Sequence, residues 1–338
     1  MKKTNYEKNH KFMRKCVTLD NHTPVKGYDF EKEFEFDSFL ESFSTTGIQA
    51  TNLYQGIEIT RKMIDEKAYI FLTMTSNIIS SGLREIITFL VKHKMIHAIS
   101  VSAGGIEEDI IKTLKPFVLG GFEIPGKVLF ENGVGRIGNI LAPYDRYLYF
   151  ERFMNPFFDR IYKQQKIRGK PFTPSEFIRE LGFQANNEES YLYWAAKNDI
   201  PVFCPGITDG SIGDLFVFQK QKRADFYIDA VGDNKKITDI CLNTEKTGAI
   251  VLGGGISKHY VLNANIFKEG LDYAVYITTA QEYDASDSGG NQEEAKTWAK
   301  IKINAPSVKI KCEASIAFPL LVAGSFLKRY QKQDRNNN

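Results

Sequence analysis

The sequence predicts an α/β protein: a single large Rossmann-like domain in which helices flank a mostly parallel sheet. Two observations carry this prediction. Short apolar runs alternate with stretches of helical periodicity, a pattern typical of crossover connections between buried parallel strands. Several of these runs also end in small or polar residues, which is where a doubly wound sheet has its ligand crevice.

The predicted elements follow one another in alternation. The predicted strands are Tyr69–Thr75, Ile96–Ala103, Ile200–Cys204, Ala249–Leu252, Tyr273–Thr278 and Val308–Cys312. Apolar residues at helical spacing predict helices over 52–66, Ser80–His93, the segment after Gly105, 147–165, 173–181 and 188–198. No Pro/Ser-rich linker or repeat divides the chain, so we expect one catalytic domain over 26–328 and a disordered tail over 329–338. For the N-terminal tail, 1–25, a site-covering segment and a disordered basic tail are both open.

Composition excludes several classes of protein. The 44 basic and 41 acidic residues give a net charge of +3, which offers no electrostatic argument for nucleic acid or a membrane surface as a partner. The longest apolar runs are too short to span a bilayer. The 4 cysteines form no C-x-x-C pair, so we expect reduced thiols in a cytoplasmic protein and no metal site.

Five predicted strand ends suggest a shared binding crevice. They are Thr75-Ser76-Asn77, Ser102-Ala103-Gly104-Gly105, Thr208-Asp209-Gly210, Gly253-Gly254-Gly255 and Thr278-Thr279-Ala280. A glycine at one such end is as often only a turn, but five ends together favour a ligand site. A Gly-x-Gly-x-x-Gly match at Gly133, Gly135 and Gly138 follows no buried strand, and we interpret it as a decoy.

An acid-rich loop and a lysine follow the last of these ends. The segment from Glu282 to Glu294 holds five acids and no base. It is either a solvated loop or a set of carboxylates for the ammonium groups of a cationic ligand. The alternation of Lys300 to Ile303 has a strand period, so we expect the preceding helix to end near Trp298 and Lys300 to turn from that junction towards the same pocket. The alternative is that Lys300 is an ordinary surface charge.

Seven segments of the chain resemble the deoxyhypusine synthase family. They are Thr75–Gly82, Ser102–Asp109, Asn132–Asn139, Thr208–Asp214, Leu252–His259, Thr279–Gly289 and Glu294–Lys300. The resemblance runs from about Val25 to Phe326. It implies an NAD-dependent enzyme that moves the 4-aminobutyl group of spermidine to one lysine of the hypusine-bearing translation initiation factor. A lysine-imine intermediate, a deoxyhypusine product and a homotetramer (a dimer of dimers with sites at subunit interfaces) are also implied.

The resemblance assigns roles to individual residues. It implies Lys300 as the nucleophile and His259 as the proton shuttle. The polyamine site that it implies consists of Asp214, Asn263, Asp287, Ser288, Glu294 and Trp298. The NAD-binding residues that it implies are Ser76, Asn77, Ser80, Ala103, Gly104, Glu108, Asp209, Gly254, Gly255, Thr279, Ala280, Asp284 and Glu313. Tyr260 stands where the family often has histidine, and Glu313 where it has aspartate. Glu282 and Glu293 receive no role, and we expect both to be solvated.

Other functions stay open at this stage. A homospermidine synthase-like enzyme would use putrescine as the acceptor and share the donor site. A regulatory paralogous subunit of low activity is a second alternative, against which the presence of Lys300 and His259 argues. An NAD-dependent deacylase is a weaker one, because such an enzyme would need a C-x-x-C zinc pair.

Overall fold

The computed structural model describes residues 18–331. Most of the predicted N-terminal tail and the end of the C-terminal tail, 1–17 and 332–338, lie outside the described residues. The site-covering role of the N-terminal tail and the division into a domain with two tails therefore stay predictions.

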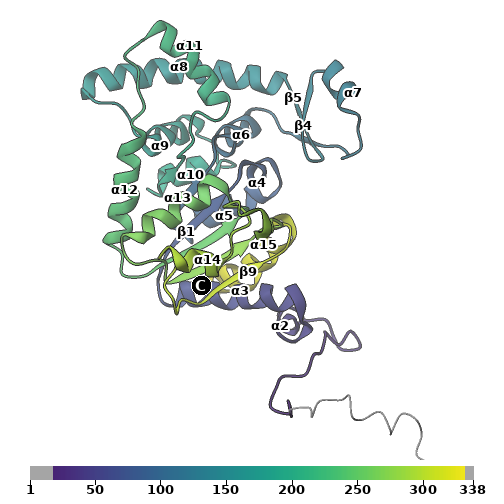
Figure 1. The fold of residues 1–338 in the computed structure, drawn as a ribbon. Coiled ribbons are helices and arrows are strands. Elements are labelled where there is room, and N and C mark those ends of the chain that lie inside the picture. The colour runs from purple at the N-terminus through teal and green to yellow at the C-terminus, as the bar shows by residue number, and fades with distance from the viewer. Residues whose placement is uncertain (1–17, 332–338) are drawn as a thin grey trace, which may run out of the picture.

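Six strands form one wholly parallel sheet, which confirms the predicted fold class (Figure 1). Their order across the sheet is β6-β2-β1-β7-β8-β9. The bounds are β1 Tyr69–Met74, β2 Ala98–Val101, β6 Val202–Phe203, β7 Thr247–Leu252, β8 Tyr273–Ile277 and β9 Ser307–Ile310. Every predicted strand is present, and most are a few residues shorter than the apolar run that predicts them. Because all six are parallel, their carboxyl ends lie along one edge of the sheet.

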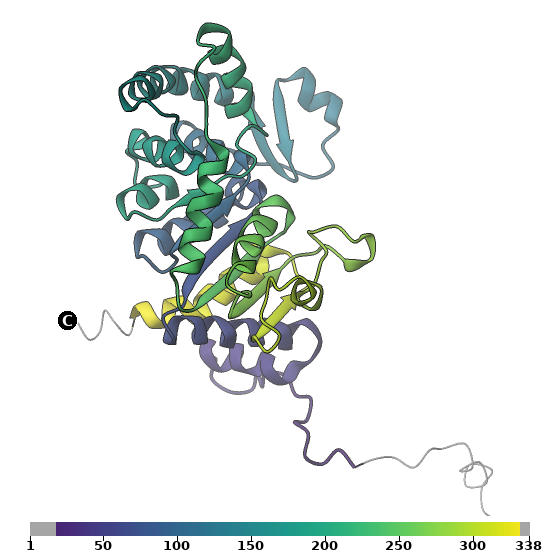
Figure 2. The same ribbon diagram turned by 60° about the vertical axis from the view of Figure 1, so that its left-hand side comes forward.

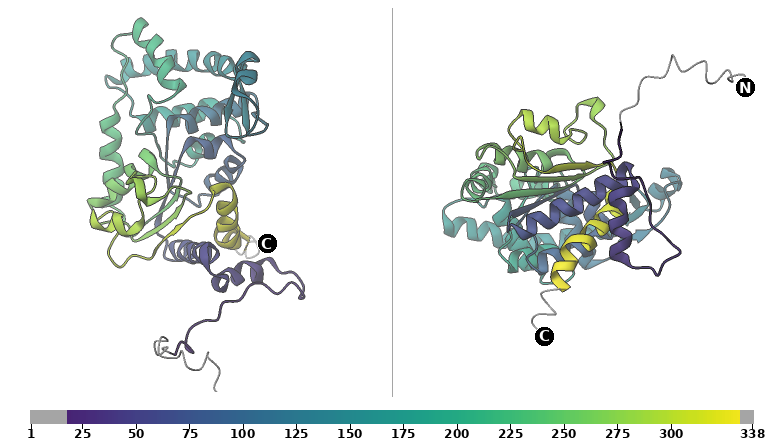
Figure 3. Two further views of the ribbon diagram at one scale, coloured as in Figure 1. Left: turned by 45° about the vertical axis from the view of Figure 1, so that its right-hand side comes forward. Right: turned by 90° about the horizontal axis from the view of Figure 1, so that it is seen from below.

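Both faces of this sheet are buried, as expected for parallel strands. In β8, Val275 packs into one apolar core while Ala274 and Tyr276 pack into the other. The first face is covered by α3 (Ile48–Asp65), α5 (Leu83–Lys92) and α15 (Ala314–Val322), and Figure 3 shows α3 and α15 side by side. The second face is covered by α12 (Ala230–Leu242), α13 (Gly255–Ile266) and α14 (Gln292–Thr297).

The remaining helices lie around this core. Their bounds are α2 Phe36–Thr46, α4 Ser76–Ser80, α6 Ala103–Leu114, α7 Gly126–Glu131, α8 Asp145–Arg168, α9 Pro174–Ala185, α10 Tyr191–Lys197 and α11 Ser211–Lys222, with a short 3-10 turn, η2, at Glu282–Asp284 and a π turn, η3, at Ala323–Leu327. The predicted helix Ser80–His93 corresponds to α5, which begins only at Leu83, because Ser80 ends α4 and Ser81 and Gly82 separate the two helices. The predicted helix at 173–181 is α9, whose start is fixed by Thr173 and Glu176 in a reciprocal capping box.

A small antiparallel sheet stands apart from the main body (Figure 2). It consists of β3 (Val118–Leu119), β4 (Val134–Ile137) and β5 (Ile140–Pro143), in the order β3-β5-β4. Gly135 lies in β4, and Gly138 has a φ of +61° in the turn to β5. These glycines shape a hairpin, which confirms that the Gly-x-Gly-x-x-Gly match is a decoy. Over residues 18–331, no helix has both the length and the apolar character needed to cross a bilayer.

Candidate functional site

The carboxyl ends of β1 and β2 bring four of the predicted cofactor residues together. Ser76 and Ser80 lie on α4, directly after β1, while Gly104 and Glu108 lie on α6, after β2. A Cβ added to Gly104 would lie 2.8 Å from the Cβ of Ser76, so only glycine allows these helices to approach so closely. The Ser80 hydroxyl donates a hydrogen bond to Oε2 of Glu108. We call these four residues the serine–glutamate cluster.

Glu108 is a buried acid, and its burial controls its protonation. Its side chain is 6% exposed. Burial raises its pKa from the ordinary value of 4.5 to about 7, against the smaller lowering effect of the Ser80 hydrogen bond. Its neighbours are buried as well: burial raises the pKa of Glu107, and that of Asp109 to about 6. Three consecutive acids of α6 are therefore buried beside the sheet edge, and each accepts at least one hydrogen bond there.

The Gly-Gly-Gly turn after β7 is required by its geometry. Gly253 and Gly255 have φ values of +84° and +67°, in the left-handed region that favours glycine. Gly254 has extended backbone, but a Cβ added there would lie 2.4 Å from the Cα of Ser288. The acid-rich loop therefore lies directly against this turn, at the start of α13. Two predicted cofactor residues, Gly254 and Gly255, thus contact the loop that carries the predicted polyamine acids.

The acid-rich loop pairs with a histidine from α13. Oδ1 of Asp287 lies 3.0 Å from Nδ1 of His259, and both side chains keep some exposure to solvent, 31% and 46%. The second carboxylate oxygen, Oδ2 of Asp287, is buried and has no hydrogen-bond partner within residues 18–331. A buried carboxylate oxygen that has no hydrogen-bond donor in the protein can accept a hydrogen bond from a ligand. Asp287 is therefore suited to bind an ammonium group while His259 orients its carboxylate.

Lys300 follows α14, as the sequence predicts. The helix ends at Thr297, Ala299 has a φ of +53°, and the Lys300 amide donates to the carbonyl of Ala295. The backbone then returns to the sheet at the start of β8, where Leu271 and Ile301 form a bridge. Within the described part of the chain, the Lys300 ammonium makes neither a hydrogen bond nor an ion pair, and it lies 6.0 Å from the centroid of the Trp298 ring.

A second lysine, Lys258, is buried and is influenced by the charges of both Lys300 and the acids. Lys258 of α13 is 3% exposed, and its Nζ lies 4.9 Å from the centroid of the Tyr276 ring. Burial lowers the pKa of Lys258, and the charges of Asp287, Lys309, Glu294 and Lys300 act on it in that order. These charges therefore surround one ammonium group on the face of the sheet covered by α13 and α14. We call Lys258, His259, Asp287, Glu294 and Lys300 the lysine–acid cluster.

Two other predicted polyamine residues, Asn263 and Asp214, lie on α13 and α11. Asn263 lines a groove of about 570 Å³ between α12 and α13, together with His259 and Tyr260. Asp214 lies on α11, and with Asp209 it contributes to the raised pKa of Glu107. Among the described residues, no hydrogen bond or ion pair joins Asp214 to the lysine–acid cluster.

The last predicted cofactor residues follow β8 and β9. The Ala280 amide donates to the Thr278 hydroxyl at 3.1 Å, while Thr279 is exposed. Asp284 accepts the Ser286 amide at 2.9 Å, and this bond lowers its pKa. Glu313 caps α15 by accepting the Ser315 amide at 2.8 Å. Asn77 is exposed at the start of α4, where its Oδ1 accepts the Thr75 hydroxyl at 2.5 Å, and Ala103 is buried at the start of α6.

Sequence reasoning missed three buried charges and misplaced one acid. Glu107, Lys258 and Lys309 are each 6% exposed or less, although nothing in their local pattern sets them apart. The expectation that Glu282 is solvated is wrong, because its Oε2 lies 3.3 Å from Nζ of Lys309 and 3.1 Å from Nζ of Lys311. Glu293 is exposed as expected and pairs with Lys296 at 2.7 Å.

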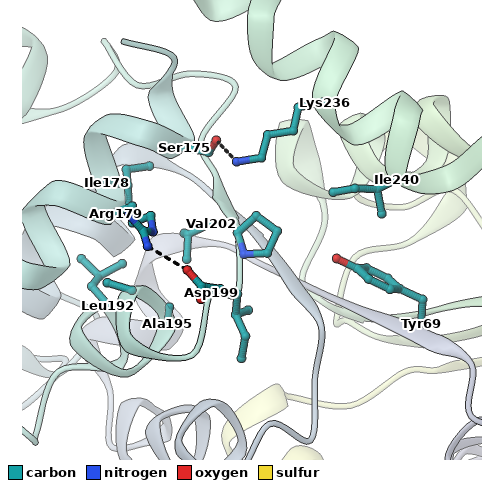
Figure 4. Close-up of a pocket in the computed structure, with 13 residues that line it drawn as sticks. Tyr69, Ser175, Ile178, Arg179, Leu192, Ala195, Asp199, Val202, Lys236 and Ile240 are labelled. Carbon is teal, nitrogen blue, oxygen red and sulfur yellow. Dashed lines mark hydrogen bonds and ion pairs between the residues drawn. The ribbon is translucent and has the colours of Figure 1, made fainter. Parts of the chain in front are cut away.

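A separate cavity of about 310 Å³ lies near the amino ends of the strands (Figure 4). Tyr69 opens β1 and Val202 opens β6, and both line it. Across the cavity, Arg179 pairs with Asp199 at 2.8 Å, and Nζ of Lys236 donates to the Ser175 hydroxyl at 2.9 Å. None of the predicted site residues line this cavity. Among residues 18–331, no cluster of His, Cys, Asp and Glu side chains is arranged to hold a metal ion.

Comparisons of this chain with a family model, with related sequences and with solved structures match it to the same family. The family model for deoxyhypusine synthase matches residues 38–325. The chain is 45% identical to the deoxyhypusine synthase of Senecio vernalis over 334 residues, covering 91% of this chain and 90% of the relative. It is 44% identical to that of Musa acuminata over 339 residues, covering 93% and 90%. A solved structure of a candidate deoxyhypusine synthase from Entamoeba histolytica is 31% identical with a TM-score of 0.67, covering 90% of this chain and 97% of that one.

Proposed function

The chain belongs to the deoxyhypusine synthase family of enzymes, and on that premise we propose a specific reaction for it. The enzyme transfers the 4-aminobutyl group of spermidine to one lysine of the hypusine-bearing translation initiation factor and uses NAD as its cofactor. The observation that carries this proposal is the lysine–acid cluster. Within residues 18–331, it combines a primary amine without a salt-bridge partner, Lys300, with a carboxylate that has a free acceptor oxygen, Asp287, and the exposed indole of Trp298 lies beside it.

The residues along the carboxyl edge of the sheet fit NAD. Gly104 adds no side chain of its own at the point where α4 and α6 begin, because a Cβ there would lie 2.8 Å from the Cβ of Ser76. Glu108, with Ser80 beside it, is the type of acid that binds a ribose hydroxyl in dinucleotide folds. The turn Gly253–Gly255 leads into α13, and the first amides of a helix suit a phosphate. NAD supplies a reversible hydride acceptor at this edge.

The lysine–acid cluster fits a polyamine. Spermidine carries ammonium groups along a flexible chain, so its site needs carboxylates spaced along a slot and an aromatic face. Asp287 and Glu294 supply carboxylates, and Trp298 supplies an indole that is 65% exposed. An indole over an alkylammonium contributes about 0.5 to 2 kcal/mol. The second oxygen of Asp287 is free to accept the hydrogen bond that such an ammonium donates.

The proposed chemistry assigns Lys300 the covalent step. Oxidation of spermidine removes a hydride from the butyl carbon next to its secondary nitrogen and gives an imine. The unprotonated amine of Lys300 attacks that carbon, and 1,3-diaminopropane leaves as the new carbon–nitrogen double bond forms on the lysine. The lysine of the protein substrate then displaces Lys300 in the same way. The hydride that was removed from spermidine is finally returned to the imine on that lysine and reduces it. These steps need a group near the leaving amine that can take up and return protons. His259, held by Asp287, is the residue that we assign to this role.

We include a homotetramer with sites at subunit interfaces in the proposal. Two features of the described residues support it. The groove between α12 and α13 exposes large apolar side chains, with Val231 at 74%, Ile256 at 52% and Phe267 at 66% exposure. Exposed apolar side chains gathered at a site favour contact with another protein surface. Among residues 18–331, Asp214 also forms no hydrogen bond or ion pair with the lysine–acid cluster, as expected if it serves a site shared with a second subunit.

One labelling experiment tests the reaction. The protein is incubated with NAD and spermidine labelled in the butyl group, together with either the translation initiation factor or putrescine. We expect label in the protein acceptor, on a single lysine. Label that appears only in a triamine product from putrescine would replace the proposal with homospermidine synthase-like activity. An absence of label in both acceptors, with the chain folded and NAD bound, would favour a regulatory subunit.

A further inference from the structure

The acid-rich loop is held by two buried ammonium groups that approach it from different elements. Nζ of Lys258, from α13, donates to the backbone carbonyls of Asp287 and of Gly290, the latter at 3.0 Å. Nζ of Lys309, from β9, donates to the carbonyl of Gly289. The two lysines thus bind backbone oxygens within four consecutive residues, from 287 to 290. They are 3% and 6% exposed.

Burying these charges is costly, so their contacts indicate a function. A lysine is rarely buried unless its ammonium group is paired, because burial removes its hydration. Neither lysine is there as an ordinary surface charge. Lys309 has one carboxylate partner, Glu282, at 3.3 Å, whereas Lys258 has no ion pair of its own within the described residues. The hydrogen bonds of Lys258 go to loop carbonyls instead. Charge-assisted bonds of this kind are about twice as strong as neutral ones.

The loop has little freedom left once these bonds form. A Cβ added to Gly289 would lie 1.7 Å from the carbonyl oxygen of Gln281, so the middle of the loop packs against the residue that precedes it. On its other side, Ser288 lies against Gly254. Between these contacts, the side chain of Asp287 reaches His259 and keeps its second oxygen buried and free. The position of that carboxylate therefore depends on how the backbone carbonyls of residues 287, 289 and 290 are held.

We propose that Lys258 and Lys309 act as a two-point clamp on residues 287–290, and that this clamp positions Asp287 for an ammonium group of the polyamine substrate. Both are positioning residues, because their ammonium groups contact the loop backbone and not the reacting atoms. The inference rests on the proposed function for the identity of the substrate. The clamp itself is a property of the loop that can be measured without any substrate.

The test uses two variants that keep the length and volume of the side chain and remove its charge, Lys258→Met and Lys309→Met. Lys311→Met is the matched control, because within residues 18–331 the Lys311 ammonium pairs with the Glu282 side chain, at 3.1 Å, and donates to no carbonyl of 287–290. Amide hydrogen exchange of the full-length protein reports on the loop. We expect faster exchange over 281–291 in both clamp variants and unchanged exchange in the control. Unchanged protection of the loop in either clamp variant that folds would overturn the clamp.

Steady-state kinetics then tests the positioning role. Loss of a charge-assisted bond corresponds to a change of about tenfold or more. We expect the KM for spermidine to rise by about that factor in Lys258→Met, with the Kd for NAD within about twofold of the parent. Lys258→Arg should restore part of the affinity, which a general loss of packing would not allow. A loop that loosens while the KM for spermidine stays unchanged would refute the positioning role. Absence of spermidine turnover in the parent protein would refute the proposed function and leave the exchange result to decide the clamp.

Discussion

Replacement of Glu108 by glutamine gives the most quantitative test of the serine–glutamate cluster. Glu108 is 6% exposed, and burial raises its pKa from 4.5 to about 7. A raised pKa means that the folded chain binds this proton more tightly than the unfolded chain does. The contribution of Glu108 to stability is therefore fully present below pH 4.5 and is lost as the pH rises through about 7. Glutamine keeps the shape of the side chain and stays neutral throughout.

The size of the effect follows from the two pKa values. The difference between 4.5 and about 7 corresponds to about 3 kcal/mol, at about 1.4 kcal/mol for each tenfold change in proton affinity. We expect Glu108→Gln and the parent to have similar unfolding free energies at pH 4.5, and the variant to be more stable by up to about 3 kcal/mol above pH 7. Glu107 and Asp109 keep their carboxyl groups in both proteins, so the difference between the two curves reports on Glu108 together with its coupling to Glu107.

Chemical denaturation at a series of pH values measures this difference. Glu123→Gln, on an exposed residue of the segment before α7, is the control and should change neither the level nor the slope of the curve. In Glu108→Gln, we also expect the Kd for NAD to rise by about tenfold at pH 8, because the variant loses a charged acceptor for the ribose hydroxyl. Parallel stability curves for Glu108→Gln and the parent would refute the reasoning, since they would mean that Glu108 has the same pKa in the folded and unfolded chains.

Three further substitutions test the loop, the turn and the core beneath them. Asp287→Asn should raise the KM for spermidine by about 10-fold or more, because it removes a charge that accepts from ammonium, and a KM equal to the parent's would exclude Asp287 from the polyamine site. Gly254→Ala should lower the unfolding free energy by about 1 to 3 kcal/mol, because its Cβ would lie 2.4 Å from the Cα of Ser288. A melting temperature equal to the parent's would show that the acid-rich loop does not rest on the Gly253–Gly255 turn. Tyr276→Phe should leave stability unchanged or raise it by about 1 kcal/mol, because the buried Tyr276 hydroxyl has no partner among residues 18–331, and a clear loss of stability on denaturation would contradict this.

The main sheet was predictable because its strands are buried on both faces. The strand β7, Thr247–Leu252, is buried at every position, and its apolar part, Ala249–Leu252, appears directly in the sequence. The antiparallel sheet was not predictable in the same way. Val118 and Leu119 are exposed, and the strand that they form has only two residues. The glycines at 133–138 indicate a turn but give no sign of the paired strands on either side of it.

The candidate site was predictable where its residues follow strand ends. Ser76, Gly104 and Gly254 come directly after predicted strands, and parallel order brings such ends to one edge. The junction at Lys300 was also predictable, because the residue period changes there from helical to alternating. The grouping of Lys300 and the acids around Lys258 was not predictable. It depends on how α13 and α14 lie on the same face of the sheet.

Buried lysines are the part of the site that a single sequence conceals. Lys309 lies between Val308 and Ile310, and this alternation predicts a side chain that points to solvent from an edge strand. The acid-rich loop covers that position, so Lys309 is 6% exposed and contacts Glu282 and Gly289. Only the path of the loop over β9 determines this burial, and the path depends on contacts between residues far apart in the chain.

Chemical trapping of the covalent intermediate tests the central claim most directly. The protein is incubated with NAD and spermidine, reduced with borohydride and digested, and the peptide containing Lys300 is analysed by mass spectrometry. We predict a stable 4-aminobutyl adduct on Lys300 that requires both NAD and spermidine and is absent from Lys300→Arg, a variant that should still bind NAD. An unmodified Lys300 peptide in a preparation that transfers the aminobutyl group, or an adduct on a different lysine, would contradict the account.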